Sequence, residues 1–160
     1  MADLTTLTLD VETTMASSHK NKAHFADPEN RLVLMGMKYT ARDNTVYNTV
    51  EWGKKLSFEE NLVDIIIGHN LTFDLHYVYK TWSDLKLKFQ KVKLWDTQLA
   101  AYILSGQQHK FASLDELSEQ YKLPLKYDKV KEYFDAGFGA DLVPKNMLAE
   151  YLKQDVYNTE

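Results

Sequence analysis

The stretch Leu7-Thr8-Leu9-Asp10-Val11-Glu12-Thr13-Thr14 decides the fold prediction. Its first part predicts a buried strand over residues 4–10, and side chains two residues apart on a strand point to the same face. Asp10 and Glu12 therefore project side by side. Two carboxylates held this close repel each other unless a proton or a cation lies between them, and oxygen ligands suit Mg²⁺ or Mn²⁺. The stretch thus predicts a metal site at a strand end.

This spacing needs support from the rest of the chain. Asp27-Pro28-Glu29 has the same spacing, but it lies in a polar, proline-containing segment, which predicts a solvated loop. The metal-site interpretation therefore requires further acidic residues from other elements.

Composition restricts the class of protein. A chain of 160 residues that is 44% apolar suits one domain, and the absence of cysteine excludes disulfide scaffolds, thiolate zinc sites and cysteine nucleophiles. The N-terminus does not resemble a signal peptide and no apolar run reaches membrane-spanning length, so we expect a cytoplasmic protein without a membrane partner. The net charge of −4 argues against a basic DNA coat but leaves nucleic acid open as a substrate.

Hydrophobic patterns predict an α/β domain with a mixed sheet, antiparallel in its front half and flanked by helices. Two β-branched or apolar runs around a polar turn predict a hairpin, and later patterns alternate strands with helices. The expected strands are 31–39, 45–52, a short one ending at 68 and one at 92–95. The expected helices follow a capping box at 57–60, run over 71–82, run over 97–104 from a cap at Asp96, follow a second capping box at 113–116, and begin near Pro144 after a loop holding Gly137 and Gly139.

Asn70 and Asp74 form a second candidate pair. They are four residues apart in the first turn of the helix predicted after a buried strand, so both lie on one face near its positive end. A plain structural interpretation makes Asn70 an N-cap and Asp74 a favourable first-turn acid.

Tyr151 and Asp155 form a third pair, four residues apart on the last predicted helix, whose apolar side includes Leu152 and Val156. A buried carboxylate needs a cation or another partner. The alternative is a solvated Asp beside a packed Tyr.

In this order the three pairs resemble the motifs of the DEDD exonuclease family, tyrosine subclass. The segments Asp10-Val11-Glu12-Thr13-Thr14, His69-Asn70-Leu71-Thr72-Phe73-Asp74 and Tyr151-Leu152-Lys153-Gln154-Asp155-Val156 are most similar to the 3′-5′ proofreading domain of bacteriophage family A DNA polymerases. Asp96-Thr97-Gln98-Leu99-Ala100-Ala101-Tyr102 resembles a recurring segment of these domains. The resemblance covers nearly the whole chain and implies a ribonuclease-H-like fold.

The resemblance implies a site with two divalent ions, Mg²⁺ or Mn²⁺, held by Asp10, Glu12, Asp74 and Asp155. Asp10 would bridge the ions, and Tyr151 would orient the attacking water rather than deprotonate it, because an ordinary phenol titrates near pH 10. The implied reaction releases nucleoside monophosphates from the 3′ end of single-stranded DNA.

Four further residues are candidates for substrate binding, because relatives wedge the terminal base near the first two motifs: Thr13, Met15, Asn70 and Phe73. Phe73 fits the hydrophobic core equally well. We expect a monomer that works with a DNA polymerase module in cis or in trans, in the host cytoplasm if the chain is phage-encoded.

Two alternatives stay open, an exoribonuclease that trims RNA 3′ ends and a catalytically silent nucleic-acid-binding domain. The chain ends five residues after Asp155, in helical sequence. We therefore expect a single exonuclease domain over residues 1–160, either free-standing or excised from a longer polymerase, and we expect a longer chain to be more active.

Overall fold

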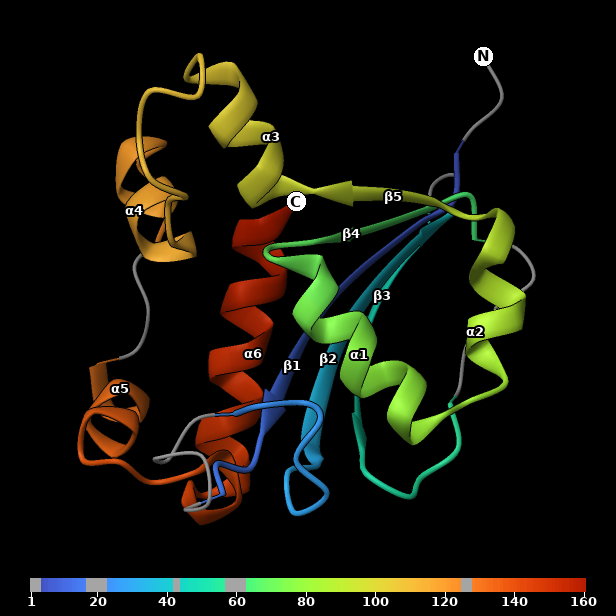
Figure 1. Ribbon diagram of the computed structural model, residues 1–160, viewed down its shortest axis with the longest axis vertical. Helices are drawn as coiled ribbons and strands as arrows, with labels where there is room; N and C mark the ends of the chain where they lie inside the picture. Colours follow the sequence, from blue (N-terminus) through green and yellow to red (C-terminus); the bar gives the residue numbers. More distant parts are fainter. Residues whose placement is uncertain (1–3, 17–22, 42–43, 57–62, 125–127) are drawn as a thin grey trace.

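The computed structural model describes residues 4–16, 23–41, 44–56, 63–124 and 128–160 (Figure 1). The strands are β1 (Thr6–Thr13), β2 (Leu32–Ala41), β3 (Asn44–Glu51), β4 (Ile65–Gly68) and β5 (Lys93–Asp96). The helices are α1 (Leu71–Thr81), α2 (Leu85–Lys88), α3 (Thr97–Leu104), α4 (Leu114–Gln120), α5 (Asp128–Asp135) and α6 (Lys145–Thr159), with 3₁₀ turns η3 (Phe89–Lys91) and η4 (Ala140–Leu142).

The strands form one sheet in the order β3-β2-β1-β4-β5. The strands β1, β2 and β3 pair antiparallel, as the predicted hairpin requires. On the other side of β1, β4 pairs parallel with β1 and β5 pairs parallel with β4. The expected α/β fold with a mixed sheet and an antiparallel front half is therefore confirmed.

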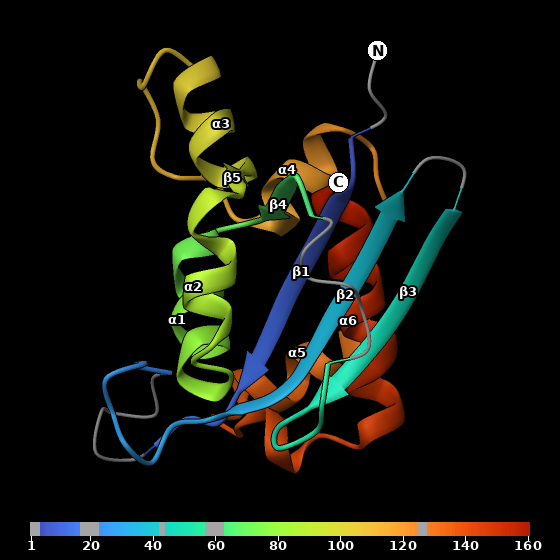
Figure 2. The same cartoon turned by 90° about the vertical axis from the view of Figure 1, so that its right-hand side faces the viewer.

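Helices cover both faces of the sheet, with α1 on one side and α6 on the other (Figure 2). The alternation of side chains along β1 fits these two layers. Leu7, Leu9 and Val11 belong to the core cluster that contains the apolar side of α1. The intervening residues of β1, which include Asp10 and Glu12, face α6.

β4 follows β1 for only three residues, from Thr6 to Thr8. Beyond that point no strand occupies this edge of β1 among the described residues. The backbone N–H of Val11 instead donates a hydrogen bond of 3.3 Å to Asp74 Oδ1 on α1. The parting of the two strands thus admits a carboxylate to the edge of β1.

Several local predictions are confirmed. The Asp96 carboxylate accepts hydrogen bonds from the backbone N–H groups of Gln98 and Leu99 at the start of α3. Ser113 and Glu116 form the predicted capping box of α4. The other capping box, at 57–60, lies outside the described residues.

Other predictions are wrong. β1 begins at Thr6 and continues to Thr13, so Asp10 and Glu12 lie within the strand and not at the end of a strand over 4–10. The segment before Gly137 was expected to be loop-rich, but it forms α5, whose Val130 is fully buried. The polar composition of α5 concealed its apolar residues, which are spaced as on one face of a helix.

The prediction of a solvated loop around Asp27 is correct only in part. Its segment is a loop, as predicted, but the side chain is only 2% exposed and therefore not solvated. Its Oδ1 accepts a hydrogen bond of 2.8 Å from the backbone N–H of Glu29. Such a local turn gives Asp27 a structural role without a metal.

Within the described part of the chain, no helix has the length and apolar character needed to span a bilayer.

Candidate metal centre

Carboxylates from β1 and α6 meet on one side of the sheet. Asp10, Glu12 and Asp155 each offer an oxygen, and the three oxygens lie within 4.8 Å of one another. Asp155 is 3% exposed, whereas Asp10 and Glu12 are half-buried. Three acidic groups this close are costly to keep charged without a cation, and their hard oxygen ligands match the preference of Mg²⁺ and Mn²⁺.

Gly36 allows α6 to approach β1 this closely. It lies opposite Asp10 in the β1–β2 register. A Cβ atom at Gly36 would lie 3.1 Å from Val156 Cγ2 and 3.3 Å from Leu152 Cβ, the residues on either side of Asp155 along the buried face of α6. The absence of a side chain at Gly36 therefore determines how near Asp155 lies to Asp10.

Asp74 completes the acidic set from the opposite side of β1. It is 2% exposed, and its Oδ2 atom is buried with no hydrogen-bond partner among the described residues. Burial raises the pKa of Asp74 well above its ordinary value, and the charge of Asp10 raises it further. A cation beside Asp74 would provide the missing partner and reverse this preference for the neutral form, so the donor set fits a divalent metal.

Asp96 fixes the start of α1 as well as that of α3. Its Oδ1 accepts a hydrogen bond of 3.1 Å from the N–H of Asn70, and its Oδ2 accepts one of 2.9 Å from the N–H of Leu71. Asn70 occupies the N-cap position with a left-handed φ of 59° and makes no capping bond with its side chain. The plain interpretation of Asn70 as the N-cap is therefore confirmed, but the carboxylate that accepts the hydrogen bonds at this helix start comes from Asp96.

Tyr151 lies one helical turn before Asp155 on α6 and is 7% exposed. Its ring contacts Phe134 of α5 edge-on, with 5.9 Å between centroids. The predicted packing role of Tyr151 is thus present, and its catalytic role stays a prediction.

Sequence reasoning missed Tyr47, a half-buried residue of β3 near the centre. Its hydroxyl donates a hydrogen bond of 3.4 Å to the carbonyl of Ala149 on α6. Burial raises the pKa of Tyr47, and the charges of Glu150 and then Asp10 raise it further. No motif marks Tyr47, because only the register of the hairpin brings it under α6.

The predicted substrate residues lie at the end of β1, on the segment that follows it and in the first turn of α1. Thr13 is buried at the end of β1, and Met15 follows it half-buried. Asn70 is exposed at the start of α1, and the half-buried Phe73 packs against Tyr77 at 5.2 Å between ring centroids. Their contact with substrate stays a prediction.

His69 has a structural role. Its Nε2 lies 3.1 Å from the carbonyl oxygen of Ala112, and its Nδ1 lies 3.1 Å from Thr97 Oγ1. Because a carbonyl only accepts, Nε2 carries the proton and donates. His69 thereby joins the start of α1 to the segment before α4.

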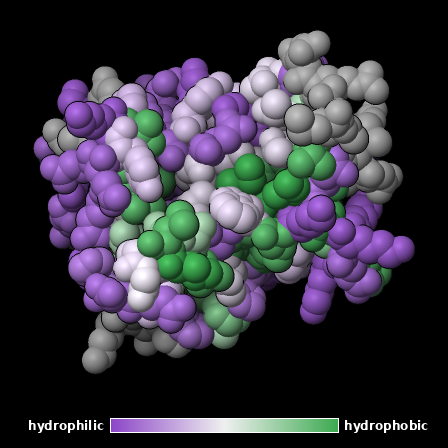
Figure 3. All heavy atoms as spheres, turned by 90° about the horizontal axis from the view of Figure 1, so that it is seen from above, coloured by the Kyte–Doolittle hydropathy of each residue, from purple (hydrophilic) through white to green (hydrophobic). Residues whose placement is uncertain are grey.

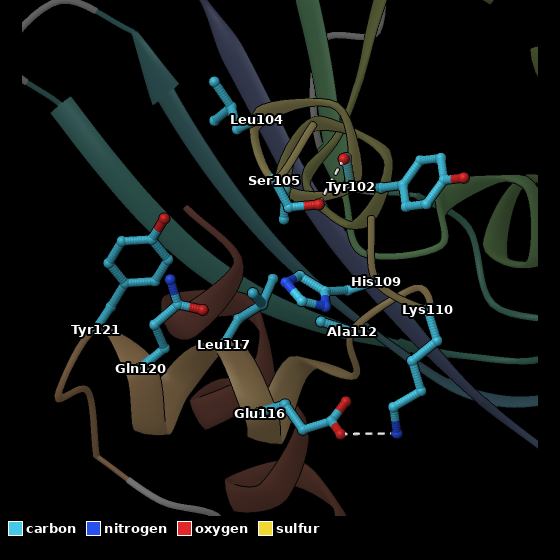
Figure 4. Close-up of a pocket in the computed structure, with 11 residues that line it drawn as sticks. Tyr102, Leu104, Ser105, His109, Lys110, Ala112, Glu116, Leu117, Gln120 and Tyr121 are labelled. Atoms are coloured by element: carbon cyan, nitrogen blue, oxygen red, sulfur yellow. Dashed lines mark hydrogen bonds and ion pairs between the residues drawn. The ribbon is translucent and has the colours of Figure 1, made fainter. Parts of the chain in front are cut away.

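A cavity of about 560 Å³ lies elsewhere, between α3 and α4 (Figure 4). None of the predicted site residues lines it, and its charged groups include Lys110 and Glu116, paired at 2.9 Å. Apolar side chains gather on this end of the molecule (Figure 3). They include Trp95, Ile103 and Leu104, each more than half exposed.

Comparison with known proteins identifies the family of the chain. The model of the 3′-5′ exonuclease family found in A-type DNA polymerases matches residues 1–159. The comparison with curated proteins gives no match. The mixed sheet with its flanking helices is consistent with the ribonuclease-H-like fold of such exonucleases. On these grounds the chain belongs to the 3′-5′ exonuclease domain family of A-type DNA polymerases.

Proposed function

We propose that the protein removes nucleoside monophosphates from the 3′ end of single-stranded DNA and proofreads during DNA replication. The observation that carries this proposal is the meeting of Asp10, Glu12 and Asp155 within 4.8 Å, beside the buried Asp74. Family membership supports exonuclease activity in general. The DNA substrate, the proofreading role and the pair of metal ions are parts of the proposal.

Four carboxylates, Asp10, Glu12, Asp74 and Asp155, would hold two divalent ions, Mg²⁺ or Mn²⁺. When bound, such ions activate a water molecule and stabilise the leaving 3′ oxygen. Asp10 would be the shared ligand, because its charge acts on Asp74 on one side and its carboxylate lies near Asp155 on the other. The chain itself holds these groups in position before substrate arrives.

Tyr151 has the role of orienting the attacking water with its hydroxyl. Its packing against Phe134 fixes the ring, so the hydroxyl is held with little loss of conformational freedom. Tyr151→Phe should keep partial activity, lower by about 10- to 100-fold, because one hydrogen bond is lost and the carboxylates stay.

Substrate enters as a single strand, whose bases stack on side chains with little sequence preference. Thr13, Met15, Asn70 and Phe73 form the binding site for the terminal nucleotides. The protein acts as a monomer in the cytoplasm, together with a DNA polymerase module in cis or in trans.

The test is digestion of 5′-labelled single-stranded DNA with Mg²⁺, Mn²⁺ or chelator, beside RNA of the same sequence. We expect a metal-dependent ladder that shortens from the 3′ end and is absent with Asp10→Ala protein. A faster ladder on RNA would replace DNA by RNA as the substrate. Full activity of Asp10→Ala protein would overturn the assignment of the centre.

A further inference from the structure

Three aromatic rings are stacked on the outer side of α1: His24, Phe25 and His76. The Phe25 and His76 rings lie 3.8 Å apart between centroids with an interplanar angle of 2°, and the His24 and Phe25 rings lie 5.3 Å apart at 11°. Phe25 is 39% exposed, and both histidines are exposed as well. We call these three residues the aromatic stack.

The loop that carries the aromatic stack is held by Lys80 of α1. Its ammonium group donates to the backbone carbonyls of Phe25, Asp27 and Asn30, at 3.2, 2.7 and 2.7 Å. The fully buried Asn30 also donates from Nδ2 to the carbonyl of His24, at 3.1 Å. The rings are therefore fixed in place before any ligand arrives, which lowers the entropic cost of stacking against them.

The aromatic stack is connected to the region predicted to bind substrate. Phe73 and His76 are three residues apart on α1 and are therefore neighbours on its surface. The loop is also tied to the segment after β1, because Asn30 Oδ1 accepts a hydrogen bond of 2.7 Å from the N–H of Ala16. A DNA strand whose 3′ end reaches Asp74 beside Phe73 would thus pass next to the aromatic stack.

We propose that the aromatic stack is a binding subsite for a nucleobase of the single strand, upstream of the 3′-terminal nucleotides. This inference rests on the proposed function. Exposed planar rings offer a surface to any base, so the subsite increases affinity without selecting a sequence. Phe25 is its central residue, because its ring stacks on both histidines and so supports the exposed histidine rings on which a base would stack.

The test compares wild-type and Phe25→Ala protein on 5′-labelled oligothymidylates from two to eight nucleotides long. Loss of base stacking predicts a KM for the octamer that rises about 5- to 150-fold, while the KM for the dinucleotide, which is too short to reach the subsite, is unaffected. Phe25→Trp should restore the KM for the octamer. Tyr121→Ala serves as the control, because Tyr121, the residue that follows α4, is an aromatic residue that is 61% exposed.

A second measurement separates this inference from the proposed function. Fluorescence anisotropy of a labelled octamer in chelator reports binding without hydrolysis, and we expect weaker binding by Phe25→Ala than by wild-type or Phe25→Trp protein. This result would support the subsite even if no protein cleaved DNA. Equal binding by the wild-type and Phe25→Ala proteins, or a KM increase of the same size at every length, would overturn it.

Discussion

The carboxylate centre and the α3–α4 cavity are built in opposite ways. At the centre, residues far apart in sequence bring buried or half-buried acids together, and Asp74 has a raised pKa. At the cavity, residues of two consecutive helices enclose about 560 Å³ beside exposed apolar groups, and the pKa of Glu116 is lowered by Lys110. In this protein the crowding of acidic groups, and not the volume of a cavity, therefore indicates the candidate active site.

The largest expected difference between the two regions is in activity. Asp155→Asn removes a ligand charge from the centre and should lower the rate of 3′ digestion at least about 100-fold, since even the supporting partners of metal ligands affect activity by about 10- to 100-fold. Lys110→Ala, which breaks the ion pair of the cavity, should leave the rate unchanged. Equal losses of rate in the Asp155→Asn and Lys110→Ala proteins would contradict the claim that activity depends on the carboxylate centre and not on the cavity.

Gly36→Ala tests how the centre is assembled without changing any acid. The added methyl group would displace Leu152 and Val156, and thereby Asp155, from Asp10. A displacement of this kind is expected to cost about 10- to 100-fold in rate. Val130→Ala, which opens space under α5, is the control for lost stability. If both variants lost stability and rate equally, Gly36 would have no specific role in the centre.

The pH dependence of stability should have opposite sign in the two regions, and it should be larger at the centre. The pKa of Asp74 is higher in the folded chain, so its contribution to stability is full below about pH 4 and is lost as pH rises through the raised pKa. Thermal unfolding in chelator should show this loss, and Asp74→Asn should remove it. A divalent ion should reverse it, because the ion binds the charged carboxylate.

The smallest effect is expected at Glu116. Its hydrogen bond to Lys110, followed by those from Ser113, lowers its pKa from 4.5 to about 2. Its contribution to stability is therefore present above pH 4.5 and is lost as pH falls through 2. Unfolding curves of Glu116→Gln protein should differ slightly from those of the wild type at neutral pH and converge with them in acid. A difference that grew in acid would contradict this sign.

Local patterns predicted the elements that carry the centre. Alternation along β1, helical spacing in α1 and α6, and caps at Asp96 and Ser113 are each set by neighbouring residues, so the sequence displays them directly. The resemblance to an exonuclease family then placed the acids in one site, and the structure brings three of them together.

Contacts between distant segments could not be predicted in the same way. Three features depend on strand register and on packing between distant segments. They are the separation of β4 from β1 after Thr8, the close approach of α6 to Gly36, and the second helix start that Asp96 caps. The aromatic stack is equally hidden, because Phe25 and His76 meet only after the loop folds over α1. The separation of β4 from β1, the approach of α6 and the Asp96 cap explain how the carboxylate centre is positioned.

The most direct test of the account is a Mn²⁺ titration followed by electron paramagnetic resonance, with wild-type and Asp10→Asn protein. We expect that the wild-type protein binds Mn²⁺ and that Asp10→Asn protein binds it at least about 10-fold more weakly, while both unfold cooperatively. Equal Mn²⁺ affinity in the two proteins would contradict the claim that Asp10, Glu12, Asp74 and Asp155 form a metal centre.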